Sequence, residues 1–298
     1  MIINSQLFLI NVSLIIYIWR KKKFLTRSCY SMGNLYQNVL FKQEKVNEME
    51  LALTQFNSKR ALSHVNSNLK LKNLGDCTLI IDSNAPNSIY YNRIKGFGNH
   101  DIDKVDYILD TYYSEQITPC FDMTPNNINF EVSQVLMNKG FFCSEQLVFL
   151  ELEPYFTEYD NREIDIVRVT ENNAKEFINL ILLSDGKEVE KDLIEKKSVY
   201  FYQSNFQNFI AYIGGEAVGM GSLFIKGEEG YIANGFTFPS YRGRKVQKSL
   251  LHFRIQVAKE LGLTKLYTDV EFGSISHNNL LKVGFESILT SSFWMKAK

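Results

Sequence analysis

The segment that most constrains this chain is a strand, a basic turn and a long helix over residues 231–251. The expected strand, residues 231–238, ends at Pro239, and Gly243 allows the backbone of the turn to approach a ligand closely. The helix that begins near Arg244 leaves its first N–H groups without partners, and its dipole favours an anion there. The segment therefore predicts a strand-turn-helix unit that can hold a phosphate group.

The charge of this turn differs from that of the whole chain. The 298 residues carry 33 Lys plus Arg against 33 Asp plus Glu, so no overall field attracts nucleic acid, and we expect no nucleic-acid partner. Pyrophosphate is the anion that best suits a local group of four positive charges, although a solvated basic surface is the alternative for the turn taken alone. The four residues are Arg242, Arg244, Lys245 and Lys248.

Strand and helix patterns alternate from residue 77 onward. The first series contains strands at 77–81, 118–122 and 142–153, a helix at 101–113 with Asp101 as its cap, and a helix at 130–138 that ends at Lys139-Gly140. The second contains strands at 164–169, 208–213, 217–225, 231–238, 265–271 and 286–295, and helices at 171–183 (capped by Thr170), 187–197, 244–261 and 276–283. The pattern predicts an α/β (α+β) fold, with a mixed central sheet flanked by helices and a smaller N-terminal α/β half.

The polar, proline-containing stretch 154–162 marks the boundary between two halves. We expect a small α/β half at 76–158 and a larger one at 163–298. Residues 24–75 are expected to form a helical connector, with a helix near 46–62 and no visible chemistry.

The N-terminal residues 1–19 are apolar and are followed by four basic residues, 20–23. Residues 1–23 are therefore a candidate membrane anchor, which would leave the rest of the chain in the cytoplasm by the positive-inside rule. Two alternatives stay open: an upstream extension, if translation begins at Met32, or a buried helix.

The cysteines offer no metal site, because none forms a Cys-x-x-Cys pair and no histidine lies nearby at ligand spacing. We expect no metal, and free thiols in a reducing compartment. The four are Cys29, Cys77, Cys120 and Cys143.

Residues 163–298 resemble the GNAT family of N-acetyltransferases. Three segments in the right order and spacing carry this resemblance. They are Phe238-Pro239-x-Tyr241-Arg242-Gly243-Arg244; Leu250-Leu251 followed by Ala258 and Gly262; and Ser274-x-Ser276-x-x-Asn279 followed by Gly284-Phe285.

The resemblance implies acetyl-CoA as co-substrate, with its pantetheine arm along the strand before Pro239 and its pyrophosphate on the Arg-Gly turn. Asn279 would approach the thioester end. We expect strands 231–238 and 265–271 to be parallel neighbours, since a helical crossover joins them. The implied cofactor-binding residues are Phe236, Thr237, Arg242, Gly243, Arg244, Lys245, Val246, Gln247 and Asn279.

The chain departs from the family pattern at three positions. The usual turn is Arg-Gly-x-Gly-x-Gly, whereas here the later glycines are replaced by Lys245 and Gln247. If Lys245 has a positive φ, its conformation costs on the order of 1 kcal/mol. Many members place a proton-donating tyrosine where this chain has Leu280.

A general base is sought on the strand 265–271, where period-two alternation puts Tyr267, Asp269 and Glu271 on one face. Glu271 is the best candidate, because it lies at the carboxyl end that faces the expected cleft; a solvated or salt-bridged carboxylate is the alternative. We expect His252 and His277 to have no catalytic role.

The first half contains Lys139-Gly140-Phe141, which repeats the Gly284-Phe285 ending of the second half. It is either a degenerate GNAT-like half that walls the acceptor site, as in tandem members of the family, or an unrelated small α/β domain. The resemblance implies an acetyl-CoA-dependent N-acetyltransferase that acts on a primary amine of a small molecule or protein. The alternative is a non-catalytic GNAT-fold module that binds CoA or a partner.

Overall fold

The computed structural model describes residues 37–158 and 162–296. The chain divides into two compact units, residues 1–45 and 46–298, and the fold below is that of the second. The candidate anchor at residues 1–23 and Cys29 lie outside the described residues. In the part that is described, no helix combines the length and hydropathy that crossing a membrane requires.

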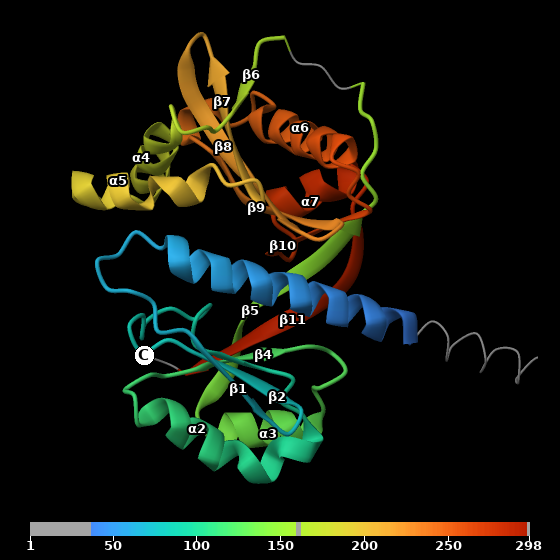
Figure 1. Ribbon diagram of the computed structural model, residues 1–298. Helices are drawn as coiled ribbons and strands as arrows, with labels where there is room; N and C mark the ends of the chain where they lie inside the picture. Colours follow the sequence, from blue (N-terminus) through green and yellow to red (C-terminus); the bar gives the residue numbers. More distant parts are fainter. Residues whose placement is uncertain (1–36, 159–161, 297–298) are drawn as a thin grey trace, which may run out of the picture. The chain divides into compact units, whose positions relative to one another are not determined.

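One mixed sheet of eleven strands forms the framework, in the order β1-β2-β3-β4-β11-β5-β10-β9-β8-β7-β6 (Figure 1). Helices pack on it, which confirms the expected fold class. The strands are β1 Lys70–Leu74, β2 Cys77–Ile81, β3 Arg93–Lys95, β4 Cys120–Met123, β5 Phe141–Leu152, β6 Asp165–Arg168, β7 Phe206–Ile213, β8 Glu216–Lys226, β9 Glu229–Thr237, β10 Lys265–Glu271 and β11 Glu286–Lys296.

The helices follow the predicted pattern, and three elements, residues 77–81, 130–138 and 265–271, have the predicted bounds. The helices are one over residues 37–60, η1 Asn99–Lys104, α2 Val105–Tyr113, α3 Phe130–Asn138, α4 Ala174–Asp185, α5 Lys191–Ser198, η2 Val199–Phe201, η3 Pro239–Tyr241, α6 Val246–Glu260 and α7 Ile275–Lys282.

Two predicted helix caps are wrong. Asp101 lies inside the 3₁₀ turn η1, where its buried carboxylate pairs with Lys104 at 2.9 Å instead of accepting from the helix backbone. Thr170 precedes a turn, and α4 begins only after Asn173. In both cases the capping residue was chosen by its type, while local pairing moved the helix start by several residues.

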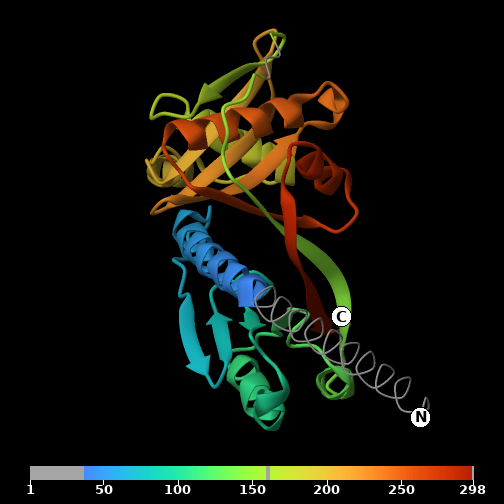
Figure 2. The same cartoon turned by 90° about the vertical axis from the view of Figure 1, so that its right-hand side faces the viewer.

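The two halves exchange their last strands. β5 belongs to the first half along the chain, yet it lies between β10 and β11; β11 ends the second half and lies between β4 and β5 (Figure 2). The expected boundary at 154–162 therefore does not divide the sheet. Each exchanged strand follows a glycine of positive φ, Gly140 at 83° and Gly284 at 102°, so the repeat seen in the sequence is also a repeat of backbone conformation.

The helix of residues 37–60 corrects the expectation of a connector without chemistry. Its side chains Val46, Met49 and Leu53 are buried in the same core cluster as Phe177 and Phe206 of the second half. The segment expected to be a connector also contains β1, which pairs with β2 over five residues. The first half therefore begins earlier than position 76 and supplies a helix to the core of the second.

Candidate active site

The site is built where two parallel strands part. β9 and β10 pair over only three positions, from Glu229 opposite Lys265 to Tyr231 opposite Tyr267. This confirms that the two strands are parallel neighbours. Beyond Tyr231, β9 continues to Thr237 without pairing to β10. Ile232 O accepts from Thr268 Oγ1 at 2.9 Å, so the edge groups that a ligand could reach on that side are those of residues 234–237.

A bulge in β9 opens the two strands. The β8–β9 register shifts between Met220 and Ser222, and Asn234 takes a φ of 50°. The Asn234 side chain donates from Nδ2 to Ser222 Oγ at 3.1 Å, and Ser222 Oγ donates to Asn208 Oδ1 at 2.6 Å. Because asparagine tolerates the left-handed region better than most residues, this position is suited to the bend.

Arg254 of α6 stabilises the bulge by donating hydrogen bonds to both strands. Its Nη1 donates to the backbone oxygens of Ser222 and Ala233, at 3.1 and 3.0 Å, and its Nε donates to Leu250 O at 3.0 Å. The side chain is 1% exposed, and burial lowers its pKa to about 9. A Cβ on Gly221 would lie 2.9 Å from Arg254 Cζ, so glycine is needed opposite the guanidinium.

A cavity of about 840 Å³ occupies the opening. Its walls come from β9 (232–236), β10 (268–270), the start of α6, α7 and the end of α4. The first half contributes the helix residues 50–62 and the loop residues 88–93. Residues of the first half thus border the cavity, while its role as the wall of an acceptor site stays a prediction.

Asp269 of β10 is the half-buried carboxylate of this cavity. It accepts a hydrogen bond at 2.6 Å from the hydroxyl of the buried Tyr231. Burial raises the pKa of Asp269, while the bond from Tyr231 opposes that rise. Burial and the neighbouring Asp269 raise the pKa of Tyr231 well above its ordinary value, so Tyr231 stays a donor.

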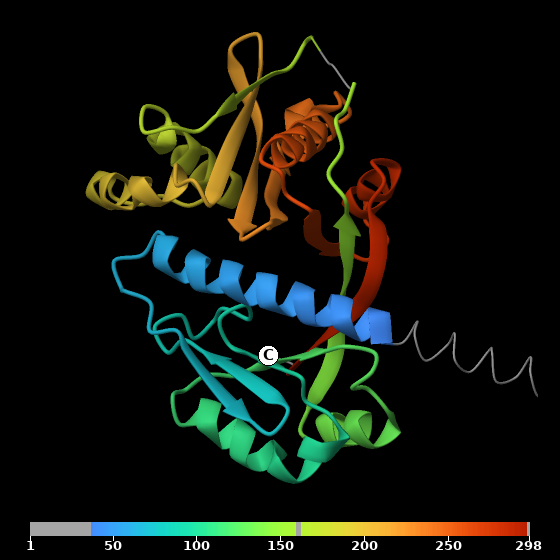
Figure 3. The ribbon, with the colours of Figure 1, turned by 45° about the vertical axis from the view of Figure 1, so that its right-hand side comes forward.

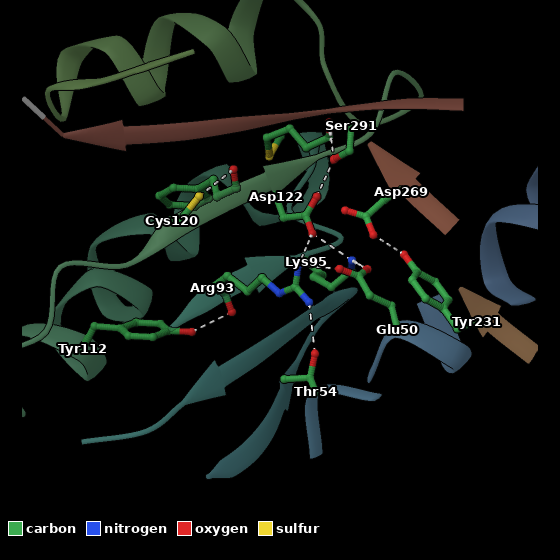
Figure 4. A network of polar contacts seen from close by, with 12 residues as sticks. Glu50, Thr54, Arg93, Lys95, Tyr112, Cys120, Asp122, Tyr231, Asp269 and Ser291 are labelled. Atoms are coloured by element: carbon green, nitrogen blue, oxygen red, sulfur yellow. Dashed lines mark hydrogen bonds and ion pairs between the residues drawn. The ribbon is translucent and has the colours of Figure 1, made fainter. Parts of the chain in front are cut away.

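A buried ionic cluster lies beside Asp269 (Figure 4). Arg93 pairs with Glu50 at 2.6 Å and with Asp122 at 3.2 Å, and Lys95 pairs with the same two carboxylates at 2.6 and 2.8 Å. Glu50 and Arg93 line the cavity, whereas Asp122 does not. The cluster thus connects the helix of residues 37–60 to β3 and β4 through ion pairs next to the cavity.

The basic turn has the geometry of an anion cradle. Gly243 has a φ of 82° and Lys245 a φ of 66°, so the chain curls before α6 begins at Val246. The N–H groups of Gly243, Lys245, Val246 and Gln247 have no acceptor among the residues that the structure describes. Such a run of unpartnered donors at a helix N-terminus suits a phosphate.

The backbone of Lys245 has the positive φ that the sequence analysis considered. It has the positive φ that the family pattern assigns to glycine, so a strain of about 1 kcal/mol accompanies the substitution. Its backbone donor nevertheless remains available. Arg242, Arg244 and Lys248 are exposed around the same turn.

The other predicted cofactor residues fall into two groups. Phe236 and Gln247 line the cavity, and the buried hydroxyl of Thr237 has no hydrogen-bond partner within residues 37–158 and 162–296. Asn279 does not line the cavity; its Nδ2 donates to Gln247 Oε1 at 2.7 Å. Asn279 therefore acts on the site through Gln247. The role of each of these residues toward acetyl-CoA stays a prediction.

Glu271, the predicted base, lies two residues beyond Asp269 on the same strand face. It is exposed and does not contribute to the cavity wall. Its catalytic role stays a prediction without support from the geometry. Leu280, in the place of the expected tyrosine, is 5% exposed and lines the cavity. Neither histidine, His252 or His277, lines it.

Several residues of the site were missed in the sequence. Arg254 had a usable signal, since an arginine lies at helical spacing between the apolar Leu250 and Ala258. Asp269 lies on the strand face that the alternation predicts, but the alternation does not separate it from Glu271 at the strand end. Glu50, Arg60 and Arg93 lie in the first half, and nothing local in the sequence links them to β9.

Comparisons with known proteins agree with this geometry. Residues 174–285 match the model of the acetyltransferase (GNAT) family. A GCN5-related N-acetyltransferase from Kribbella flavida has a TM-score of 0.57 at 14% identity, over 77% of this chain and 90% of that chain. A functionally unknown conserved protein from Staphylococcus epidermidis has a TM-score of 0.58 at 11% identity, over 78% of this chain and 95% of that chain.

The two-half arrangement also has a counterpart. A tandem GNAT protein from the clavulanic acid biosynthesis pathway has a TM-score of 0.50 at 11% identity, over 83% of this chain and 94% of that chain. No curated protein sequence matches this chain. Residues 174–285 thus carry the match to the acetyltransferase (GNAT) family, and the distant solved structures share the fold of the chain.

Proposed function

We propose that this chain is an acetyl-CoA-dependent N-acetyltransferase that acetylates a primary amine in the cavity between β9 and β10. One observation carries the proposal. The two strands part beside a phenol-carboxylate pair, the buried Tyr231 and the half-buried Asp269, in a domain that also presents a basic turn with free N–H donors.

The residues of the second half fit acetyl-CoA. The unpaired edge of β9, including Phe236 and Thr237, would hold the pantetheine arm through backbone groups. The turn 242–247 would hold the pyrophosphate through its N–H donors and its positive side chains. Bound acetyl-CoA supplies the thioester whose acetyl group is transferred to the amine.

Asp269 is the group that we propose as general base. An amine must lose its proton before it can act as a nucleophile, so a carboxylate with a raised pKa suits this step. Asp269 is half-buried in the cavity wall, and Tyr231 holds one of its oxygens in place. Its carboxylate therefore attracts an ammonium group, orients it and accepts its proton.

A second candidate function is a GNAT-fold module that binds CoA without turnover. Leu280 favours it, because this cavity position carries no proton donor where the resemblance expects a tyrosine. Tyr90, which also lines the cavity, is a donor that could serve instead, since burial and the nearby Asp269 raise its pKa and keep it protonated.

Calorimetric titration of the full chain with acetyl-CoA tests the proposal. We expect micromolar binding, weakened about tenfold in Arg242→Ala because a charge-assisted contact to phosphate is lost. Arg168→Ala on the edge strand β6 is the matched control, since this arginine is exposed on another element. Thiol release from acetyl-CoA with a panel of amines then separates the enzyme from the binding module. Absence of binding at millimolar acetyl-CoA contradicts both candidate functions.

A further inference from the structure

Arg60 ends the helix of residues 37–60 and lines the cavity. This end of the helix lies beside α5 (Figures 1 and 3). The Arg60 guanidinium lies 4.8 Å from the ring centroid of Phe206 and 5.3 Å from that of Phe201. The two rings thus hold a cation in a defined position in the cavity wall.

Three side chains in this part of the wall have unused hydrogen-bond donors. Arg60 Nε donates to Asn57 Oδ1 at 2.7 Å, which leaves both Nη atoms of Arg60 and the Nδ2 of Asn57. Tyr91 lies close enough to Arg60 for each to influence the pKa of the other. No residue of the described part of the chain accepts a hydrogen bond from these Nη atoms, this Nδ2 or the Tyr91 hydroxyl. All three side chains line the cavity, so a ligand there can use these donors.

The positive charge of Arg60 is not offset within residues 37–158 and 162–296, where no carboxylate pairs with it. Asp185, which also lines the cavity, pairs instead with Lys187 at 3.3 Å. Arg93 is held by two carboxylates, and Arg254 donates to three backbone carbonyls. Burial lowers the pKa of Arg60 to about 10. A partly desolvated cation of this kind is costly unless a ligand supplies the negative charge.

Arg60 lies in a different part of the cavity wall from the proposed base. Its stacking partner Phe206 belongs to β7, and β8 and β9 lie between β7 and β10, the strand of Asp269. The charges that influence the pKa of Asp269 are those of Glu50 and Arg93, and Arg60 is not among them. A group bound at Arg60 is therefore distinct from the amine that Asp269 would deprotonate.

We propose that Arg60, Asn57 and Tyr91 form an anion subsite of the cavity that binds a carboxylate group. The free Nη edge of the planar guanidinium offers two parallel donors, which match the two oxygens of a carboxylate. The subsite has one positive charge, whereas a phosphate monoester carries about two negative charges at neutral pH, so a carboxylate is the better match. The subsite does not depend on the proposed function, because neither acetyl-CoA nor Asp269 takes part.

Titration of the full chain with small carboxylates tests the subsite directly. The probes are benzoate and 3-methylbutanoate, and each is compared by calorimetry with its neutral amide. We expect the wild type to bind each carboxylate about 10- to 100-fold more tightly than its amide, since hydrogen bonds to charged groups have this strength. Inorganic phosphate is the third anion, and we expect it to bind more weakly than either carboxylate.

Variants assign the effect to the three side chains. Arg60→Met removes the charge and should abolish the preference for carboxylates, whereas Arg60→Lys keeps the charge without the planar fork and should retain part of it. Tyr91→Phe should weaken carboxylate binding about 2- to 10-fold, because one neutral donor is lost. Tyr90→Phe is its matched control, since Tyr90 also lines the cavity but its pKa is influenced by Asp269 and Arg93 and not by Arg60. A melting curve of each variant shows whether it is folded.

Equal binding of carboxylates and amides by the wild type overturns the proposal. So does an unchanged preference in Arg60→Met with a lower melting temperature, because Arg60 would then only stabilise the helix end. A preference that is lost in Arg242→Ala instead would place the anion on the basic turn, and tighter binding of phosphate than of both carboxylates would contradict the ligand class. If Arg60→Met does not fold, Arg60→Lys and Tyr91→Phe decide. These titrations contain no acetyl-CoA, so failure of the proposed function leaves their outcome unaffected.

Discussion

Asp122 in β4 and Asp269 in β10 occupy equivalent positions in the two halves. Asp122 pairs with Phe293 of β11, and Asp269 pairs with Phe149 of β5. Phe149 lies eight residues after Phe141 and Phe293 eight residues after Phe285, the residues that follow the paired glycines Gly140 and Gly284. Each aspartate therefore lies at an equivalent position, opposite the exchanged last strand of the other half.

The neighbours of the two aspartates differ. In the register of β3 on β4 and of β9 on β10, Arg93 corresponds to Tyr231. Lys95, two residues further along β3, corresponds by count to Ala233, which lies beyond the end of the β9–β10 pairing. Asp122 thus meets two cations, whereas Asp269 meets a phenol.

The pKa values follow from these neighbours. Burial alone would raise the pKa of Asp122, but Lys95 and Arg93 hold it below its ordinary value. The pKa of Asp269 is raised, because burial and the nearby Glu50 outweigh the hydrogen bond from Tyr231 and the charge of Arg93. The residues on the adjacent strand therefore distinguish the two halves. Beside Asp122, β3 supplies the cations of a buried ionic cluster; beside Asp269, β9 supplies a phenol and the wall of a cavity.

The largest effect should come from Asp269→Asn. We expect kcat to fall about 10²- to 10⁴-fold, the usual contribution of a general base, with little change in acetyl-CoA affinity. The melting temperature should change little, because no cation is left without a partner. Rates with the best amine of the panel, together with a melting curve, provide the measurement. Glu271→Gln is the matched control; a larger loss in that variant would restore Glu271 as the base.

In Asp122→Asn we expect the opposite, a large loss of stability rather than a direct loss of kcat. Removing one carboxylate from between Arg93 and Lys95 leaves buried charge uncompensated, which costs about 3–5 kcal/mol of the free energy of unfolding. Since the folded-state pKa of Asp122 is lowered, its contribution is present at neutral pH and is lost as the pH falls through that value. Urea unfolding at pH 7 measures the cost. A cost below about 1 kcal/mol would mean that the two aspartates differ less than their neighbours suggest.

Much of this comparison was accessible from the sequence, and some of it was not. Apolar periodicity, interrupted by glycine and proline, located most elements, and the Arg-Gly turn located the run of free N–H donors before α6. The Gly-Phe repeat also pointed to two similar halves. The strand exchange was not predictable, because β5 and β11 read as ordinary strands whichever half they pair with.

The residues of the site were harder to predict than the fold. Asp269 and Glu271 share a face, and only the position of the cavity separates them. The helix of residues 37–60 has a polar composition typical of a connector, yet it supplies Glu50 and Arg60 through contacts with residues far away in the sequence. Such long-range contacts leave no local signal in a single sequence.

Tyr231→Phe should have an effect of intermediate magnitude, on the pH dependence of the activity. The phenol donates to the carboxylate form of Asp269 and lowers its pKa, so its removal should raise that pKa further. Because the base must be deprotonated, activity falls as the pH is lowered, and in the variant it should fall at a pH about one unit higher. The profile of kcat/KM against pH is the measurement. A shift to lower pH would show that Tyr231 does not stabilise the charged form.

The smallest effect concerns the basic turn, which the first half lacks. Lys245→Gly replaces a residue at a φ of 66° by one that adopts this conformation without strain. We expect the free energy of unfolding to rise by up to about 1 kcal/mol, because the relief of strain exceeds the entropy that the added glycine gives to the unfolded chain. Lys248→Gly, inside α6, is the matched control and should lower stability by a similar amount.

Acetyl-CoA titration of both variants then separates the effect of charge on affinity from that of conformation. Each variant loses one lysine, but only Lys248→Gly places a glycine inside α6. If Lys245→Gly destabilises the protein, the side chain of Lys245 has a contact that outweighs its strained backbone.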